Sequence, residues 1–444
     1  MTNFHRVLIN TVVANFATAF LWFGWSFWVY LETRSVLINA IISGSYMALL
    51  SITSIFFGGL VDRFKKKQVM IASSVITSAA FLGAGALFLA LPKERIIDLG
   101  GVWFWLIGGL VLGGAVVENM RNIALSTTVT LLVPDGERDR ANGLVGAAQG
   151  LAFMATSIFA GLAIGLLGMG WTALLAIVAT VLALVHLVFV AIPEKGVFHD
   201  PANRPKAFDL AGSWSAIRAV PGLMALIFFS CFNNFVGGLM MALLDPYGLT
   251  LFSVELWGVV LGVTSAGFII GGLVIARRGL GANPLRTLLL VNVVVSIVGM
   301  TFVIREWHWL LVVGIFAYMC LIPAAEAAEQ TIIQRVVPLP RQGRVFGFAT
   351  SVETAATPIS ALAIGPIAEF WLIPWVDSPA GEATWGWLLG EGDARGIALV
   401  FILSAALMLV VVLLAFRTRA YAGLSRFYAD SAPVQGAPSQ AEQR

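Results

Sequence analysis

Residues 58–67 read GGLVDRFKKK, and this short charged segment separates two apolar runs at 36–61 and 69–91. Each run is long enough for a membrane-crossing α-helix, which needs about 20 apolar residues. The segment is therefore expected to form a short loop at a membrane surface. Its first four letters return as GGLV at 271–274, at the end of another apolar run. This echo predicts a repeated membrane unit.

The composition excludes a soluble domain. Hydrophobic residues make up 59% of the 444 residues, charged residues make up 11%, and the mean hydropathy is +0.90. Soluble domains carry about 25% charged residues. The two cysteines, Cys231 and Cys320, lie inside apolar runs, so they are expected to be inert buried thiols and not a disulfide framework.

Twelve apolar runs are long enough to cross a bilayer, so the predicted fold is all-α and polytopic. An even number of spans places both termini on one side of the membrane. In chain order the predicted spans cover 7–30, 36–61, 69–91, 102–133, 142–168, 171–192, 218–244, 255–276, 286–304, 309–335, 345–372 and 396–416.

Lysine and arginine are distributed unevenly between the two sides. The side with the termini holds 21 of the 27, the other side holds five, and Arg121 lies inside a span. Because cytoplasmic loops carry the excess of positive charge, both termini are predicted to be cytoplasmic, in a bacterial cytoplasmic membrane. The sequence pI near 9.0 then reflects orientation in the bilayer, and no nucleic-acid partner is expected.

The second half of the chain repeats the first. Four features recur 204 positions later: Trp105-Leu106 as Trp309-Leu310, Val133-Pro134 as Val337-Pro338, Arg140 as Arg344, and Gly143 as Gly347. The predicted organisation is a six-helix bundle at 1–193, a polar linker at 194–217, a second six-helix bundle at 218–417 and a cytoplasmic tail at 418–444. The tail is rich in Ser, Pro, Gln and Ala after Asp430 and is expected to be partly disordered.

The loop at 58–67 resembles the loop motif of the major facilitator superfamily, Gly-x-Leu-Ala-Asp-Arg-x-Gly-Arg-Lys, with Lys65 in place of its second glycine. Residues 138–143 (RDRANG) and 343–347 (GRVFG) look like the branch that contains macrolide and multidrug proton antiporters. The fifth span departs from the antiporter pattern Gly-Pro-x-x-Gly-Gly, because residues 156–161 read TSIFAG.

This resemblance implies two bundles that rock about a midplane site. It also implies that Asp62 contacts the positive N-terminal end of the eleventh span and holds the cytoplasmic side shut, which contributes about 0.3 to 1 kcal/mol. The candidate gate residues are Gly58, Asp62, Arg63, Arg140 and Arg344. A compatible alternative is that the basic loop only fixes the topology.

Charged residues inside the spans are the main candidates for function. A charge at mid-bilayer costs about 2.5 to 3.5 kcal/mol on insertion scales, so it is expected to face a cavity or a partner. In the fourth span Glu118 and Arg121 are three residues apart and share a helix face, with Asn122 beside them. The alternative is an ion pair that neutralises itself and only supports the helix.

The tenth span carries Glu326 and Glu329, and the eleventh carries Glu353. Two carboxylates three residues apart in a poorly solvated place cannot both ionise cheaply, so one is expected to hold a proton near neutral pH. Glu353 lies roughly 13 Å from Arg344 and Glu329 roughly 9 Å from Arg335 along their helices, which predicts a comparable depth. The candidate proton-coupling and substrate residues are therefore Glu118, Arg121, Asn122, Glu326, Glu329 and Glu353.

The first and seventh spans supply candidate cavity residues, because the resemblance implies that they line the central cavity. These are Asn15, Phe16, Asn233, Asn234 and Phe235. An aromatic pocket with a few carboxylates suits an amphiphilic cation.

These observations predict a secondary transporter that exports lipophilic or cationic drugs in exchange for protons, and so confers antibiotic resistance. The alternative is a transporter of a specific, anionic metabolite that binds to Arg121. No P-loop, metal-ligand spacing or serine nucleophile motif occurs, so the protein is not expected to be an enzyme. No cofactor is expected, because the proton gradient supplies the energy. The expected partners are a small-molecule substrate, protons and the lipid bilayer, and the protein is expected to be a monomer.

Overall fold

The computed structural model describes residues 2–33, 36–194, 209–390 and 395–431, and every regular element in these ranges is a helix. Eleven helical segments in the described ranges are long and apolar enough to cross a membrane. A further long helix, α12 (Leu339–Ile367), occupies the predicted eleventh span and is not among them, since Arg341, Arg344 and Glu353 interrupt its small and apolar residues. The predicted all-α polytopic fold is confirmed.

The twelve predicted spans correspond to eleven long helices, because one of these helices contains two spans. That helix is α6 (Arg138–Phe189), in which Gly168 has a φ of 78° and reverses the chain between the fifth and sixth spans. A left-handed φ favours glycine because a Cβ would clash there. The remaining spans are α1 (Thr2–Thr33), α2 (Val36–Arg63), α3 (Lys66–Ala90), α5 (Val102–Leu132), α8 (Leu223–Leu251), α9 (Val254–Arg278), α10 (Pro284–Thr301), α11 (His308–Val336), α12 and α15 (Arg395–Phe416).

Two seams join the halves: α2 packs on α12, and α6 packs on α9. Glycines permit this close approach. A methyl group added at Gly58 would lie 3.0 Å from the Cα atom of Gly347, and one added at Gly143 would lie 2.7 Å from the backbone nitrogen of Ala276. The repeated glycines in the sequence therefore mark the two contacts between the bundles, as expected for helices that pack closely in lipid.

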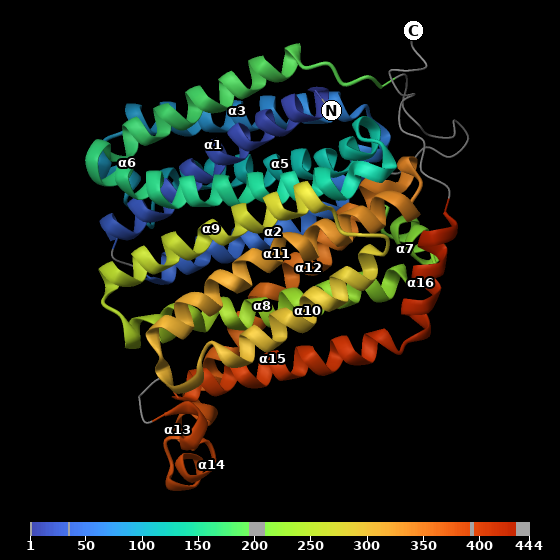
Figure 1. The fold of residues 1–444 in the computed structure, drawn as a ribbon. Coiled ribbons are helices and arrows are strands. Elements are labelled where there is room, and N and C mark those ends of the chain that lie inside the picture. Colours follow the sequence, from blue (N-terminus) through green and yellow to red (C-terminus); the bar gives the residue numbers. More distant parts are fainter. Residues whose placement is uncertain (1, 34–35, 195–208, 391–394, 432–444) are drawn as a thin grey trace.

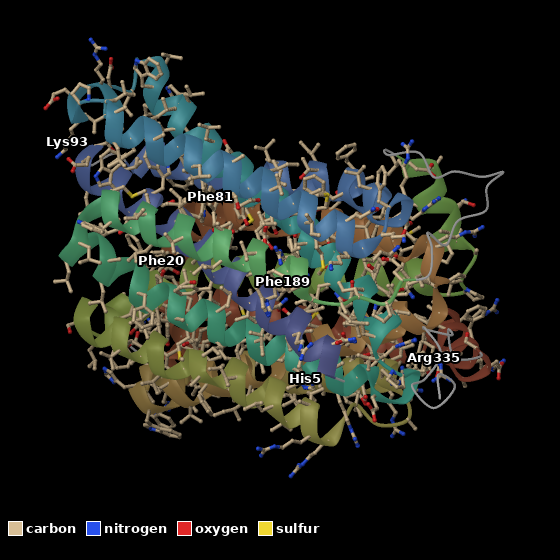
Figure 2. All side chains as sticks on the ribbon, turned by 90° about the horizontal axis from the view of Figure 1, so that it is seen from above. His5, Phe20, Phe81, Lys93, Phe189 and Arg335 are labelled. Carbon is tan, nitrogen blue, oxygen red and sulfur yellow. The ribbon has the colours of Figure 1, made fainter. Side chains whose placement is uncertain are left out.

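The start of α1 and the short helix α16 (Arg419–Asp430) lie at the same end of the bundle (Figure 1). We call this the terminal end. Figure 2 shows His5 and Arg335 towards this end and Lys93 at the far one, which we call the opposite end. The short helix α4 (Lys93–Ile96) lies there too.

One predicted span boundary needs correction, and part of the predicted tail is helical. The seventh span begins at Leu223 and not at 218, because α7 (Leu210–Arg218) ends in the linker and Gly222, with a φ of 82°, reverses the chain before α8. Residues 419–430 of the predicted tail form α16, and its Leu424 is buried against the bundle. The predicted disorder after Asp430 concerns residues that, from 432 on, lie outside the described ranges.

Candidate functional site

The N-terminal bundle holds a buried ion pair. The Nε atom of Arg121 lies 2.6 Å from the Oε1 atom of Glu118, and the side chains are respectively 0% and 4% exposed. Arg121 also donates to the Oδ1 atom of Asn10 over 2.6 Å and to the hydroxyl of Ser74, while Ser73 donates to Glu118 over 3.3 Å. These partners lie on α1 and α3, so the guanidinium points into its own bundle.

Asn122, one residue further on, has a different environment. Its Oδ1 atom accepts a hydrogen bond of 2.9 Å from Asn15 on α1, and both residues are half-buried. The structure thus brings together two residues that the sequence suggested separately. Phe16 stacks on Phe20, with 5.6 Å between ring centroids. Asn119, which sequence reasoning missed, donates to Ser54 on α2 over 3.0 Å.

The C-terminal bundle holds two glutamates, Glu329 and Glu353, that form no ion pair with any residue in the described ranges. Glu329 on α11 and Glu353 on α12 lie within hydrogen-bonding reach of each other, as their predicted depths suggested. Ser230 on α8 donates to the Oε2 atom of Glu329 over 2.7 Å. The Oε1 atoms of both glutamates are buried and have no protein partner. Two carboxylates can adopt this arrangement at low cost only when a proton lies between them.

The expectation that Glu326 or Glu329 holds a proton stays a prediction. Glu326 lies one turn from Glu329 on the same helix, and its side chain is exposed. The direct partner of Glu329 comes from the neighbouring helix because α11 and α12 present their carboxylates at the same depth. Spacing along one helix could not reveal this contact.

Ser230 lies on α8, which also carries the predicted cavity residues. Asn234 donates to the backbone oxygen of Ser230 over 3.0 Å, and its own backbone oxygen accepts a long hydrogen bond from Thr357 of α12. Asn233 and Phe235 are half-buried, and Phe235 stacks on Phe232. The helix that carries the predicted cavity residues therefore also positions the carboxylates.

Asp62 makes the contact that the family resemblance implies. Its two carboxylate oxygens accept hydrogen bonds from the backbone nitrogens of Gly343 (2.6 Å) and Arg344 (3.0 Å), near the start of α12. The Arg344 guanidinium pairs with Asp62 at 3.1 Å and with Asp209 of the linker at 2.9 Å. A buried carboxylate thus joins the halves at the terminal end, and its gating role stays a prediction.

The other two predicted gate residues lie apart from this cluster in the described part of the chain. Arg63 lies over the ring of Phe64, and Arg140 is exposed. In the second seam a different residue makes the equivalent contact: Asp139 at the start of α6 accepts a hydrogen bond of 2.7 Å from the backbone nitrogen of Leu280.

A buried polar cluster at the terminal end was missed from the sequence. Arg138 is 1% exposed and donates to the backbone oxygens of Val133, Thr130 and Gln334. Asn142 donates to the side chain of Gln334 over 2.9 Å, across the two halves. The sequence feature that could have revealed this cluster is the duplicated Val-Pro at 133–134 and 337–338, because the two loops that carry it meet here.

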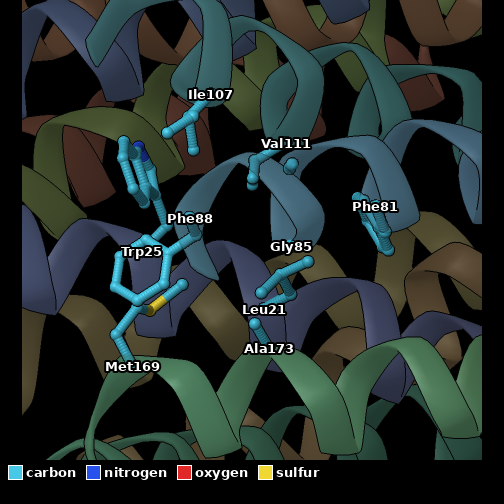
Figure 3. Close-up of a pocket in the computed structure, with 10 residues that line it drawn as sticks. Leu21, Trp25, Phe81, Gly85, Phe88, Ile107, Val111, Met169 and Ala173 are labelled. Carbon is cyan, nitrogen blue, oxygen red and sulfur yellow. The ribbon is translucent and has the colours of Figure 1, made fainter. Parts of the chain in front are cut away.

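Figure 3 shows an apolar pocket inside the N-terminal bundle, among α1, α3, α5 and α6. Its lining includes Trp25, Phe81, Phe88, Ile107 and Met169 and contains no charged residue. It lies in the other half from Glu329 and Glu353, so we regard it as a packing gap.

Comparisons with known proteins agree on one family for this chain. The family model of the Major Facilitator Superfamily matches residues 7–361. Macrolide efflux protein A of Streptococcus pyogenes is 22% identical over 316 residues, which cover 69% of this chain and 74% of that protein. Its counterpart from Enterococcus faecalis is 22% identical over 313 residues, which cover 68% and 92%.

Solved structures agree with the fold. A bacterial homologue of the iron transporter ferroportin, in an outward-facing state, matches with a TM-score of 0.67 and 16% identity over 94% of this chain and 100% of that one. The fucose:proton symporter of E. coli matches with a TM-score of 0.66 and 11% identity over 92% and 98%. The family and the fold are those of transporters rather than enzymes. The chain is a multi-pass membrane protein that belongs to the Major Facilitator Superfamily and resembles its macrolide efflux branch.

Proposed function

We propose that this transporter exports lipophilic, often cationic compounds from the bacterial cytoplasm in exchange for protons, with macrolides as the first substrates to test. The observation that carries the proposal is the contact between Glu329 and Glu353, two carboxylates inside the membrane without a neighbouring cation. The similarity to macrolide efflux proteins supports the choice of substrate.

The hydrogen bonds suggest where the proton resides. Ser230 donates to Glu329, and a hydrogen bond to the charged form of a carboxyl group favours that form. Glu353 then holds the proton and donates it to the free oxygen of Glu329. Loss of that proton would leave two adjacent anions, a state that a cationic substrate would stabilise. Protonation would remove this attraction and release the substrate.

The closed contacts at the terminal end support an assignment to one step of this cycle. If the termini are cytoplasmic, as the distribution of basic residues predicts, Asp62 and the Gln334 cluster close the cytoplasmic side. The carboxylates would then exchange protons with the outside. Each proton that enters contributes about 2.3 kcal/mol per 100 mV of membrane potential and about 1.4 kcal/mol per pH unit.

Purified protein in liposomes with an imposed pH gradient tests the proposal. We expect uphill transport of a macrolide and of a cationic dye, which collapses when an ionophore removes the gradient. Glu329→Gln should abolish this uphill transport, whereas Glu94→Gln, which changes an exposed carboxylate at the opposite end, should leave it unchanged. If the rate of transport of both compounds does not depend on the pH gradient, proton exchange is refuted.

The alternative of an anionic metabolite bound to Arg121 finds little support. The Arg121 side chain is 0% exposed, and Glu118, Asn10 and Ser74 already occupy its guanidinium. An anion would have to displace a carboxylate that is 2.6 Å away.

A further inference from the structure

A helical excursion connects the last two spans. It consists of a π-helical turn, η3 (Ala368–Leu372), followed by α13 (Ile373–Val376) and α14 (Pro379–Leu389). In the repeat, the equivalent connection between the fifth and sixth spans is a reversal at Gly168 inside α6. The excursion is therefore an addition to one half. Figure 1 shows α13 and α14 beyond α15, beside the bundle and towards the opposite end.

The excursion is a packed unit and not a loose loop. Val376 and Leu389 are 0% exposed and belong to the hydrophobic core of the C-terminal bundle. The guanidinium of Arg305 donates twice to the backbone oxygen of Trp387, over 3.1 and 3.0 Å. Arg395 at the start of α15 pairs with Asp377 at 3.3 Å. These contacts fix the excursion to the C-terminal bundle.

Large aromatic side chains cover its outer face. Trp371 is 76% exposed, Phe370 and Trp387 are each 68% exposed, and Trp375 is 46% exposed. Several large exposed aromatic side chains on one short segment indicate an interaction site. It continues the lipid-facing surface of α12, where Leu362 is 77% exposed.

We propose that η3, α13 and α14 form a platform that lies in the headgroup layer of the bilayer at the opposite end, with its tryptophan rings in the lipid. Tryptophan is enriched at this depth because its ring is apolar and its N–H is polar. Hydrocarbon would exclude the helix ends and the charged rim formed by Asp377 and Glu382, while water would exclude the aromatic face. Only the headgroup layer accommodates both.

The platform anchors one bundle only. Because it is attached through Arg305, Arg395 and the core of the C-terminal bundle, it would fix the depth of that bundle in the lipid. The N-terminal bundle has only the reversal at Gly168 in the equivalent place and would move against it. This proposal needs the membrane location of the chain and is independent of what the chain transports.

Site-directed spin labelling tests the depth of the platform. Trp387→Cys and Trp371→Cys are introduced separately with Cys231 and Cys320 changed to alanine, and the labelled protein is placed in nanodiscs of phosphatidylcholine and phosphatidylglycerol. Glu94→Cys provides the aqueous reference and Ile359→Cys, on the exposed face of α12, the lipid reference. Collisions with oxygen and with a water-soluble nickel chelate are measured at each site.

We expect both platform labels to collide more with oxygen and less with nickel than the Glu94 label, and less with oxygen than the Ile359 label. Labels as accessible to nickel as that at Glu94 would refute the proposal. Labels shielded from both reagents, with spin–spin broadening, would show docking against a second copy and also refute it.

A second measurement avoids the cysteine changes. Lipids brominated near the headgroup should quench the tryptophan fluorescence of the natural chain, and the conservative variants Trp371→Phe and Trp387→Phe should each lose part of that quenching. Quenching that is equal in the natural chain and in both variants would contradict the proposed depth.

Discussion

The two bundles differ in the charges that surround their buried carboxylates. In the N-terminal bundle Glu118 has a cation 2.6 Å away and accepts a hydrogen bond from Ser73, while that cation, Arg121, donates to Asn10. In the C-terminal bundle Glu329 and Glu353 face each other, and one oxygen of each has no protein partner. A carboxylate paired with an arginine stays ionised when its surroundings change. Two carboxylates in contact bind or release a proton under the same change. Under the proposed function, the N-terminal pair supports its bundle and the C-terminal pair couples transport to protons.

Removal of Arg121 should give the largest effect on stability. Arg121→Met leaves the Glu118 carboxylate buried and uncompensated, and loss of one partner from a buried ion pair costs about 3 to 5 kcal/mol. We expect a large fall in the unfolding temperature in detergent. The matched variant Glu329→Gln should unfold near the natural temperature. If Arg121→Met proved as stable as the natural chain, the structural role of the first pair would be wrong.

Substitutions of Ser230 test whether its hydrogen bond to Glu329 sets the pH dependence of transport. Ser230→Ala removes a hydrogen bond to a charged group, which contributes about 1.5 to 3 kcal/mol. Because that bond favours the anion, its loss should keep the pair protonated to higher pH, and the pH midpoint of transport should rise by about one to two units. Ser230→Thr keeps the hydroxyl and should stay near the natural midpoint. An unchanged profile in Ser230→Ala would remove Ser230 from the coupling site.

The two seams allow a further comparison. Asp62 is 0% exposed and joins the halves through two backbone N–H groups and Arg344, whereas Asp139 is half-buried and joins them through Leu280. Asp62→Asn should therefore open the terminal end more than Asp139→Asn. Labelling of a cysteine introduced at Ser126, behind the closed contacts, measures the opening. Equal labelling in both variants would show that the burial of the aspartate does not determine how strongly each seam holds the terminal end closed.

The contact between α16 and Arg335 should give the smallest effect. The Arg335 guanidinium lies 4.6 Å from the ring centre of Tyr428, and exposed cation–π contacts contribute about 0.5 to 1 kcal/mol. Tyr428→Leu should weaken the closed state slightly, because Arg335 also pairs with Asp135 of the other half at 2.8 Å. The same cysteine labelling should detect a modest rise, and Tyr428→Phe, which keeps the ring and loses only the hydroxyl, should show a smaller one. A rise as large as that in Asp62→Asn would contradict this ranking.

The sequence predicted the spans and the repeat well because both follow from apolar length and from glycines at close helix contacts. It also placed Asp62 against the start of α12, since that contact belongs to a loop motif. The Glu329 partner could not be predicted, because contact between neighbouring helices depends on their rotation and not on spacing within one helix. Arg138 looked like one more basic loop residue, although it is buried at the terminal end. The start of the seventh span was placed at 218 instead of Leu223, where the short helix α7 precedes the long apolar helix α8.

The central claim is that the Glu329 and Glu353 pair couples transport to protons, and Glu353→Gln tests it most directly. In liposomes, exchange of labelled for unlabelled substrate without a gradient needs only the alternation of the two bundles. Uphill transport needs the proton. We predict that Glu353→Gln retains exchange and loses uphill transport. Uphill transport at the natural rate in this variant would contradict the account.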